Sequence, residues 1–515
     1  MIATLPVSGV LKRTLDVLDR AVRSRHGCAP ATPRAAAGTA DAHGASRRSP
    51  GEVTMRTELP AESQSGTGSD AHGSVKELAA RGVRVIAVTM VDNAGVARVK
   101  AVPIAAFERS LRWGLGLSPI FNVCTVVDTF TRSADVGGPT GDLRLIPDPA
   151  AVRLCAEPGW AFAPADQHTQ DGEVFGCCQR SFARRMVGEA GARGLEPRFG
   201  WELEWFLGSE AEGAFQPAYI SPAYGLSALA EVATYARELV QLLADSGVHI
   251  GQVHPEYAPG QLEISLPHGD PVASADVNVF ARQVIRSVSV RHGWRASFSP
   301  AVMPLQVGNG GHLHFSVLRD GRNLFARGEG PHGMTPVGES FLAGVLAELP
   351  ALMAIGAPSV ASYLRLAPSR WAGAYACWGL ENREAAMRFV AGTAGSEQAT
   401  ANCEVKCFDQ SANPYLASGA LIAAGLHGVE QARTLPPEVL DDPAVLSQQE
   451  REALGAERLP RSLDASISAL ERSEVIRSAM GPMLFGALLA VRRAELETFK
   501  DADPDAVLAA HRWRY

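Results

Sequence analysis

Four short segments in which polar and apolar residues alternate constrain the fold of this chain most strongly. They read Trp-Glu-Leu-Glu-Trp at residues 201–205, Gln-Leu-Glu-Ile at 261–264, Gly-His-Leu-His-Phe at 311–315 and Asn-Cys-Glu-Val-Lys at 402–406. Alternate side chains of a β-strand share a face, so each segment places Glu, His or Lys on one face and apolar residues on the other. Several such strands predict a sheet curved around a polar interior, which would suit hard divalent cations and an anionic ligand.

Composition narrows the classes of protein to which the chain can belong. Its 515 residues are 46% hydrophobic, which is enough for a sizeable core, and its net charge of −7 argues against nucleic acid as a partner. No apolar run approaches the roughly 20 residues that cross a bilayer, and no secretory signal pattern is present. None of the eight cysteines forms a CxxC pair, and we interpret the adjacent Cys177 and Cys178 and the strand-spaced Cys403 and Cys407 as small buried apolar residues in a reducing compartment. We therefore expect a cytoplasmic protein without a membrane partner.

The chain divides into three segments by composition. Residues 1–74 are rich in Gly, Ser and His, apart from an amphipathic helix predicted over 11–23, and are expected to be a disordered tail. An alternative is that translation begins further downstream, at Met55. We expect a small N-terminal α+β domain over residues 75–170 and a large α+β domain over 171–515.

Local patterns predict the elements of both domains. In the small domain, strands are expected over 83–92 and 96–102 around an Asn93-Ala-Gly95 turn, followed by a helix over 104–113. In the large domain, periodicity predicts helices that lie between strands, and hence a sheet flanked by helices. The predicted helices cover 180–194, 227–246, 273–291, 414–428 and 462–499, the last broken at Gly481-Pro482, and the strands cover 198–208, 261–266, 311–318, 384–390 and 401–408.

Acidic residues are the first candidates for chemistry. Glu202 and Glu204 share a strand face roughly 7 Å apart. An exposed strand edge with two solvated carboxylates is the plain alternative, but the surrounding residues Trp201, Leu203 and Trp205 favour burial. A buried carboxylate pair requires cations or protons, because unpaired buried charge is costly, so we interpret the pair as metal ligands.

Further candidate ligands come from two other segments. Glu256 and Glu263 stand seven residues apart across a Pro- and Gly-containing turn, and His312 and His314 share one strand face behind a Gly-rich stretch that begins at Gly308. Glycines at such a place allow the backbone to approach a ligand closely. Each motif alone is more often a surface or structural feature than a functional one.

Basic residues complete the set. Arg365, Arg370, Arg383 and Arg388 fall within 24 residues, and Lys406 shares a strand face with Glu404. A solvated basic face is the alternative, but guanidinium groups suit carboxylates and phosphates. Together with the acidic residues they indicate phosphoryl transfer from a nucleotide. No GxxxxGK[ST] motif is present, so the chain is not expected to be a P-loop enzyme.

The order of these motifs resembles the glutamine synthetase family, type I-like, over about residues 78–515. Each motif alone is weak evidence for the family, whereas six motifs in the order of the family are highly specific. The resemblance rests on Trp201–Leu207, His254–Ile264, Gly310–Ser316, Glu381–Arg388, Glu404–Ala417 and Leu459–Leu463.

The resemblance implies a role for each candidate residue. One metal would be held by Glu202, His312 and Glu404, and a second by Glu204, Glu256 and Glu263. Oxygen-rich ligation with one imidazole fits two Mg²⁺ or Mn²⁺ ions per site. Glutamate would be contacted by Gly308, Arg365 and Lys406, and ATP with its transferred phosphoryl group by His314, Ser316, Arg383 and Arg388. Arg383, Arg388 and Glu404 would be the catalytic residues.

In the family, ATP phosphorylates the γ-carboxylate of glutamate, and an amine then displaces the phosphate. The resemblance also implies a β-grasp-like N-terminal domain and a catalytic domain with a curved antiparallel sheet and flanking helices. Family members form double hexameric rings, in which the small domain completes the neighbouring subunit's active site. We therefore expect a homo-oligomer, a dodecamer by resemblance.

Departures from the family pattern narrow the substrate. Trp371 falls where glutamine synthetases carry a Glu that helps to bind ammonium, so it is predicted to contact a larger amine. The Asp-Gly-Ser-Ser element of the small domain is missing: Gly116–Val123 stands in its place and Asp128 follows. The Trp371–Gly379 run resembles the γ-glutamyl-amine branch, whose members join glutamate to polyamines, ethanolamine or similar amines.

Two more departures concern glutamate binding and regulation. Lys406 replaces a usual Arg, and a lysine cannot form the two-pronged contact of a guanidinium. No Tyr occurs between Tyr415 and Tyr515, so control by tyrosine adenylylation is not expected. The leading hypothesis is an ATP-dependent glutamate–amine ligase. The alternatives are a glutamine synthetase that uses ammonium, and a non-catalytic sensor or scaffold, for which six intact metal ligands would be unnecessary.

Overall fold

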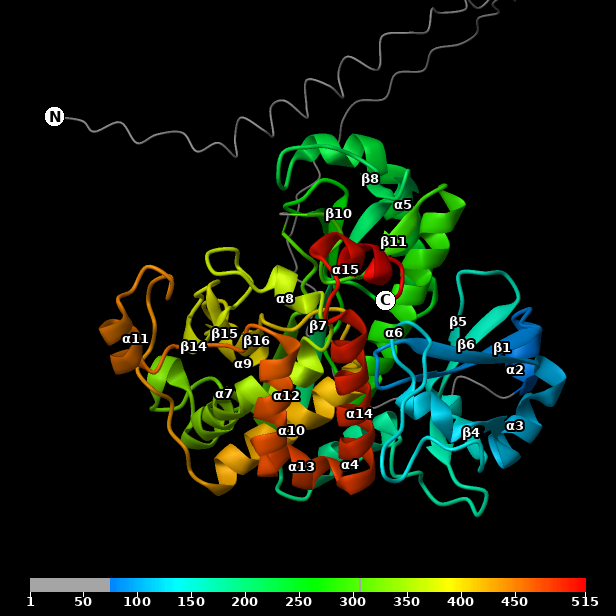
Figure 1. The fold of residues 1–515 in the computed structure, drawn as a ribbon, viewed down its shortest axis with the longest axis horizontal. Coiled ribbons are helices and arrows are strands. Elements are labelled where there is room, and N and C mark those ends of the chain that lie inside the picture. Colours follow the sequence, from blue (N-terminus) through cyan, green and yellow to red (C-terminus); the bar gives the residue numbers. More distant parts are fainter. Residues whose placement is uncertain (1–74, 305–306) are drawn as a thin grey trace, which may run out of the picture. The chain divides into compact units, whose positions relative to one another are not determined.

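The computed structural model describes residues 75–304 and 307–515 (Figure 1). The tail predicted over residues 1–74, with its helix over 11–23, lies outside the described residues. Within them, the strands form two sheets. The first contains only strands from the first hundred or so described residues, and the second contains strands from the remainder of the chain.

The first sheet has six strands in the order β2-β1-β6-β4-β3, with β5 paired to β6. Strand β1 pairs antiparallel with β2 and parallel with β6, which gives the β-grasp-like arrangement. Short helices flank the sheet. The elements are α2 (Val75–Ala80), β1 (Val85–Val91), β2 (Ala97–Pro103), α3 (Phe107–Trp113), β3 (Leu115–Leu117), β4 (Leu143–Pro147), β5 (Arg153–Leu154) and β6 (Trp160–His168).

The turn between β1 and β2 is where the sequence predicted it. The Asp92 side chain accepts hydrogen bonds from the backbone N–H groups of Ala94 and Val96, as Asp commonly does in turns. Gly95 has a φ of 83°, a conformation that favours glycine. A Cβ at Gly95 would also lie 2.0 Å from the carbonyl oxygen of Ser411, so the turn packs directly against the larger part of the fold.

The second sheet has eleven strands, and its main path runs β17-β14-β15-β16-β12-β7-β10-β9. Strand β7 is central and long, and it also pairs with β8 and β11, while β13 pairs with β12. The strands are β7 (Glu196–Ala211), β8 (Ala214–Pro217), β9 (Gln252–Pro255), β10 (Gln261–Ser265), β11 (Arg295–Ser297), β12 (Leu313–Arg319), β13 (Arg322–Asn323), β14 (Tyr375–Leu380), β15 (Ala385–Val390), β16 (Asn402–Val405) and β17 (Glu457–Arg458).

The register of this sheet confirms the alternation seen in the sequence. Glu404 on β16 lies opposite His314 on β12 and Arg388 on β15, and Glu263 on β10 lies opposite Glu204 on β7. Residues directly opposite one another share a face, so these polar side chains face the same way. The intervening apolar residues of β7, Trp201, Leu203 and Trp205, are buried in the main core.

Two strand predictions need correcting. The sheet is antiparallel except at β14 and β15, which run parallel. Strand β16 ends at Val405, whereas the sequence predicted a strand to residue 408. The chain turns after this point because the Asp409 carboxylate accepts hydrogen bonds from the backbone N–H and the hydroxyl of Ser411.

Helices cover the large sheet, and α10 packs against both α7 and α4 (Figure 1). Asn413 caps the start of α10 by accepting hydrogen bonds from the N–H groups of Tyr415 and Leu416, with Pro414 in the first turn. The helices are α4 (Gln179–Gly191), α5 (Leu226–Asp245), α6 (Pro271–Arg291), α7 (Pro336–Gly356), α8 (Ser362–Arg365), α9 (Glu397–Thr400), α10 (Pro414–Glu430), α11 (Gln448–Leu454), α12 (Leu463–Arg472), α13 (Glu474–Met480), α14 (Pro482–Phe499) and α15 (Pro504–His511).

The predicted helices are present, one of them with an additional break, and one long helix was missed. The helix predicted over 462–499 breaks at Ser473 as well as at Gly481, because the Ser473 side chain caps α13 by accepting from the Ile476 N–H. Helix α7 was not predicted, since it is apolar on nearly all sides and lacks the periodicity of an amphipathic helix. The fold class is confirmed: the protein is α+β, with a small β-grasp-like sheet and a large curved sheet flanked by helices.

Helix α7 also corrects the expectation that no segment is apolar enough to span a bilayer. Among the described residues it is the one helix that satisfies this test by length and composition, and the bent pair α13 and α14 satisfies it only when taken together. However, 72% of the most apolar stretch of α7 is buried inside the fold. Its apolarity is therefore accounted for by packing in the core.

Candidate active site

The polar face of the large sheet lines a cavity of about 830 Å³. Residues from strands β7, β9, β10, β15 and β16 contribute to it, together with the loops before β12 and β14. Most of the residues predicted from the sequence meet there. The predicted residues that line it are Glu202, Glu204, Glu256, Glu263, Gly308, His312, Arg365, Arg370, Trp371, Arg383, Arg388, Glu404 and Lys406.

His314 and Ser316 do not line this cavity. Both lie on β12, where their alternate positions place them on the face of His312. The His314 Nδ1 atom lies 2.9 Å from the Asn402 side-chain oxygen, and its Nε2 atom lies 3.3 Å from a Glu202 oxygen. Ser316 lies opposite Arg198 of β7. Their predicted role in binding ATP stays a prediction.

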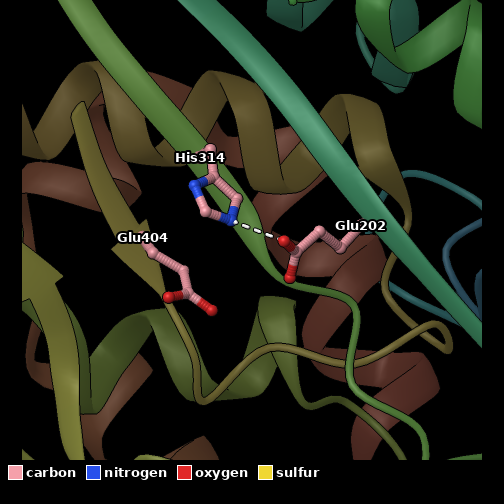
Figure 2. Close-up of side chains that lie close together, drawn as sticks. All are labelled: Glu202, His314 and Glu404. Atoms are coloured by element: carbon pink, nitrogen blue, oxygen red, sulfur yellow. Dashed lines mark ion pairs between the residues drawn. The ribbon is translucent and has the colours of Figure 1, made fainter. Parts of the chain in front are cut away.

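One group of potential metal ligands joins Glu202, His314 and Glu404, whose ligand atoms all lie within 4.8 Å of one another (Figure 2). His312, the imidazole predicted for this position, is also close. Its Nδ1 atom lies 2.9 Å from a Glu202 oxygen and 3.1 Å from a Glu404 oxygen. The structure therefore brings the predicted set together and adds His314 to it.

The charges of neighbouring side chains determine whether Glu202, His314 and Glu404 are protonated. Burial would raise the pKa of Glu202, yet hydrogen bonds from His312 and His314 hold it well below its usual value. Burial acts against ionisation of Glu404 as well, but the charges of Lys406 and the two histidines lower its pKa to about 2. Burial would lower the pKa of His314, whereas Glu202 raises it to about 9. Both carboxylates are therefore ionised at neutral pH.

The second group joins His254, Glu256 and Glu263. Burial, together with the charges of neighbouring glutamates, raises the pKa of Glu263 to about 11, and burial and Glu204 raise that of Glu256. Carboxyl groups that repel one another in this way require positive charge to ionise. This donor set fits hard divalent cations, which would supply that charge.

Glu204, which was predicted for the second metal, has its own partners. One of its oxygens accepts hydrogen bonds from the Gly310 backbone N–H at 2.8 Å and from Gln261 Nε2 at 2.9 Å. Its other oxygen lies 3.7 Å from His312 Nε2, which places Glu204 between the two groups. A Cβ at Gly310 would lie 2.3 Å from His312 Nε2 and 2.7 Å from a Glu204 oxygen, so a larger residue there would displace two of the candidate ligands.

The cationic residues surround Glu404. Arg388 Nη1 and Lys406 Nζ each lie 3.0 Å from one of its oxygens. Arg365 is buried and donates to the Lys406 carbonyl at 3.0 Å, while its Nη1 atom has no hydrogen-bond partner among the residues that the structure describes. The same is true of Arg388 Nε. Such orphaned buried donors suit an anionic ligand.

Gly308 and Arg383 complete the predicted substrate contacts. A Cβ on Gly308 would lie 1.9 Å from the Pro300 carbonyl oxygen and 3.0 Å from the Arg365 side chain, so only glycine fits there. Arg383 is exposed at the cavity and has no ion-pair partner among the described residues. Its guanidinium is therefore available to a ligand.

Several residues of the site escaped the sequence analysis. His254 was part of a quoted motif, and its spacing from Glu256 was the available signal. Gln261 was also in that motif, where it now orients Glu204. Tyr257 also lies within that motif but was given no role, whereas Tyr224 had no sequence signal, and both line the cavity.

Asp128 lies away from this cavity. Its carboxylate forms ion pairs with Arg98 at 2.7 Å and with Arg514 at 2.8 Å, and these pairs lower its pKa. The loop that carries it thereby joins the small sheet to the C-terminal end of the chain. Within the described chain, Asp128 does not reach the residues of the candidate site.

Comparison with known proteins agrees with this geometry. Family models match residues 71–174 as a glutamine synthetase N-terminal domain and residues 176–508 as the glutamine synthetase catalytic domain. The γ-glutamylpolyamine synthetase GlnA3 of Streptomyces coelicolor is 48% identical over 443 residues, which are 85% of this chain and 95% of that protein. A glutamine synthetase of Mycobacterium tuberculosis is 29% identical over 442 residues, or 83% of this chain and 95% of that one.

Solved structures show the same fold. A crystal structure described as a novel glutamine synthase homolog has a TM-score of 0.74 and 32% identity, and the match covers 84% of this chain and 99% of the other. GmaS in complex with ADP also has a TM-score of 0.74, with 27% identity over 84% and 97% of the two chains. Enzymes of this kind are ligases that depend on ATP and divalent metals. The chain belongs to the glutamine synthetase family.

Proposed function

We propose that this protein joins the γ-carboxylate of L-glutamate to an organic amine, a polyamine, ethanolamine or a similar molecule, through a γ-glutamyl phosphate. The observation that carries the proposal is the cavity itself. It combines buried carboxylates and guanidinium groups with an aromatic wall that includes Trp371. The 48% identity to a γ-glutamylpolyamine synthetase supports the choice of amine.

Two divalent cations, Mg²⁺ or Mn²⁺, are proposed for each site. Glu202, His312 and Glu404 would hold one, and Glu204, Glu256 and Glu263 the other. When bound, the cations would neutralise the charge between the phosphates of ATP and the carboxylate of glutamate. The short distances from His312 to both Glu202 and Glu404 support the first set. His314 and His254, which lie beside the two sets, would orient the carboxylates.

The cationic residues would bind and position the anionic substrates. Arg365 and Lys406, beside Gly308, would bind glutamate, since Arg365 lines the cavity and has a buried donor without a hydrogen-bond partner among the described residues. Arg383 and Arg388 would stabilise the transferred phosphoryl group, and His314 and Ser316 would contact ATP. Fixed donors in a site closed to water stabilise charge that develops during transfer and protect the acyl phosphate from hydrolysis.

The arrangement of the whole chain is part of the same proposal. A division between residues 75–170 and 171–515 is supported by the two separate sheets and by the two family models. We propose a cytoplasmic homo-oligomer, a dodecamer, as in the family that the sequence resembles. A neighbouring subunit's small domain would then complete the site.

The test is release of phosphate from ATP in the presence of Mg²⁺ and glutamate, with the product mass measured. Ammonium, ethanolamine, putrescine, spermidine, isopropylamine and an aromatic amine would be compared, and reactions without glutamate would serve as controls. We expect turnover with organic amines that exceeds turnover with ammonium. Turnover that is best with ammonium would instead identify a glutamine synthetase. The absence of product with every amine would favour a non-catalytic sensor or scaffold.

A further inference from the structure

The loop of residues 366–374, between α8 and β14, is held in an uncommon conformation beside the candidate active site. Ser369, Trp371 and Gly373 have φ values of 55°, 54° and 65°. Residues other than glycine rarely adopt such values, and surrounding contacts have to maintain them. The loop contributes four residues to the lining of the cavity, namely Ser369, Arg370, Trp371 and Ala372. The position of these residues therefore depends on the contacts that anchor the loop.

Arg458, on β17, contacts both ends of this loop. Its Nη2 atom donates to the Leu366 carbonyl at 2.8 Å, and its Nη1 atom donates to the Ala374 carbonyl. Because a guanidinium is planar and rigid, these two hydrogen bonds fix the distance between the first and last residues of the loop. Arg458 does not line the cavity itself. Any effect that it has on a substrate is therefore transmitted through the loop.

Strand pairing and an aromatic ring determine where the Arg458 guanidinium lies. Strand β17 pairs antiparallel with β14, which places Arg458 opposite Tyr375, the residue that follows the loop. The guanidinium lies over the Tyr375 ring, with its central carbon 5.2 Å from the ring centroid, and forms a cation–π contact there. Arg458 is half-buried, so these contacts are partly shielded from water. The guanidinium is therefore held where it reaches both carbonyl groups.

The other contacts of the loop do not replace those of Arg458. Two of them hold the middle of the loop, at the Trp371 backbone N–H and at the Ser369 hydroxyl. The Ala374 carbonyl also accepts a hydrogen bond from a backbone N–H at 3.1 Å. In contrast, the Leu366 carbonyl has no second donor among the residues that the structure describes. Replacement of Arg458 would therefore release the Leu366 end of the loop from β17.

We propose that Arg458 is a positioning residue for catalysis, which keeps Arg370 and Trp371 at the cavity by joining the two ends of their loop. This inference rests on the proposed function and extends it to a residue outside the cavity. Trp371 is the proposed contact of the amine, so a loop that is in place in only a fraction of the molecules lowers the apparent affinity for the amine by that fraction. The proposed contacts of ATP lie on other elements and should be unaffected.

The kinetic test compares two substitutions of Arg458. Arg458→Met removes both hydrogen bonds and keeps an unbranched side chain. We expect the KM for the amine to rise by about tenfold, the effect of one lost hydrogen bond to a charged group, while kcat and the KM for ATP change little. Arg458→Lys reaches only one carbonyl and should restore part of the affinity. Each substrate is varied in turn with the others saturating, and the amine is the organic amine that the wild type uses best.

Limited proteolysis reports on the loop without any turnover. Trypsin cleaves after arginine, and cleavage of a folded protein follows the fraction of molecules in which the segment is open. Without substrates, Arg458→Met should therefore be cut after Arg370 about tenfold faster than the wild type, as measured from the fragment masses. Arg461→Met alters an exposed arginine of the same segment and, as the matched control, should change neither this rate nor any KM. Thermal midpoints and the size of the assembly are measured for every variant, and if Arg458→Met fails to fold, Arg458→Lys carries the test.

The outcomes separate the role of Arg458 from the proposed function. Either an unchanged KM for the amine or unchanged cleavage after Arg370 in the folded Arg458→Met variant would overturn the positioning role and leave the ligase intact. Equal rises in the KM of every substrate, or the same changes in Arg461→Met, would also overturn it, because they would show a general effect on the fold. A wild type that forms no γ-glutamyl product with any amine would overturn the proposed function and with it the role of Arg458 in catalysis, whatever the rate of cleavage.

Discussion

The carboxylate of Glu384 accepts a hydrogen bond from the backbone N–H of Trp371 at 2.7 Å. Glu384 is buried, while the Trp371 side chain is exposed at the cavity. Trp371 has a φ of 54°, which is uncommon for a bulky residue and has to be maintained by surrounding contacts. A second contact, from the Ser369 hydroxyl to Asp442 at 2.6 Å, holds the same loop. Glu384 therefore holds the backbone of Trp371 at the cavity, where Trp371 is proposed to contact the amine.

Replacement of Glu384 should affect the amine more than the other substrates. Glu384→Ala removes a hydrogen bond to a charged group, of a kind that contributes about 1.5–3 kcal/mol, so we expect kcat/KM for the amine to fall by about tenfold or more. The KM for ATP should change little. Glu384→Gln retains an acceptor oxygen and should restore part of the activity.

The matched control for this prediction is Glu381→Gln, an exposed glutamate in the same connection between β14 and β15. Steady-state kinetics with each substrate varied in turn provide the measurement. Equal changes in the KM of ATP and of the amine would show that Glu384 acts on the whole fold, not on Trp371.

Binding of divalent metal should stabilise the protein through the two glutamate groups. A ligand present at 100 times its Kd stabilises the folded state by about 2.7 kcal/mol, so Mn²⁺ should raise the thermal midpoint and EDTA should reverse the rise. Glu202→Ala and Glu263→Ala should each reduce this rise. Glu231→Ala, an exposed residue of α5, should not. A full Mn²⁺ response in both of the first two variants would disprove the ligand assignment.

Glu404 should be essential for turnover, because it lies against Arg388, Lys406 and the histidines of β12. Glu404→Gln is expected to abolish phosphate release. It should also destabilise the protein by about 3–5 kcal/mol, because it leaves buried cations uncompensated.

A double variant separates the two effects of this substitution. Lys406→Met in the Glu404→Gln background removes one of those cations and should recover part of the stability but none of the activity. Thermal unfolding and phosphate release are measured on the same samples. Retained turnover in Glu404→Gln would exclude this residue from catalysis.

Stability should decrease as pH rises through the titration of Glu495, a buried residue of α14. Burial raises its pKa from 4.5 to about 7, although Arg492 and a hydrogen bond from the Val126 N–H oppose this. The folded state therefore holds a proton that the unfolded state has lost, and this contribution is present below pH 4.5 and is lost between about pH 4.5 and 7. The loss amounts to about 2–4 kcal/mol.

Glu495→Gln cannot titrate and should remove this dependence. The difference in thermal midpoint between the variant and the wild type should therefore grow in favour of the variant from pH 5 to pH 8. Glu497→Gln, an exposed neighbour on the same helix, provides the control. A difference that stays constant with pH would mean that Glu495 is ionised throughout this range.

Much of the site was predictable because strand alternation is a local property. Glu204 lies opposite Glu263 and Glu404 lies opposite His314 by register, as the alternation in their strands indicated. The break at Gly481 and the turn at Gly95 were equally clear, since glycine and proline act on the backbone directly. In contrast, α7 was missed because a helix buried on all sides carries no periodic signal.

By itself the sequence determined which residues face the polar interior, because alternation in a strand requires no knowledge of its neighbours. Only the tertiary structure decided which of these residues meet. It added His314 to the group of Glu202 and Glu404, and it placed Glu384 where its carboxylate accepts a hydrogen bond from the Trp371 backbone. It also paired Asp128 with Arg98 and Arg514. These contacts join segments far apart in the chain, and they depend on strand order and loop paths that no local pattern encodes.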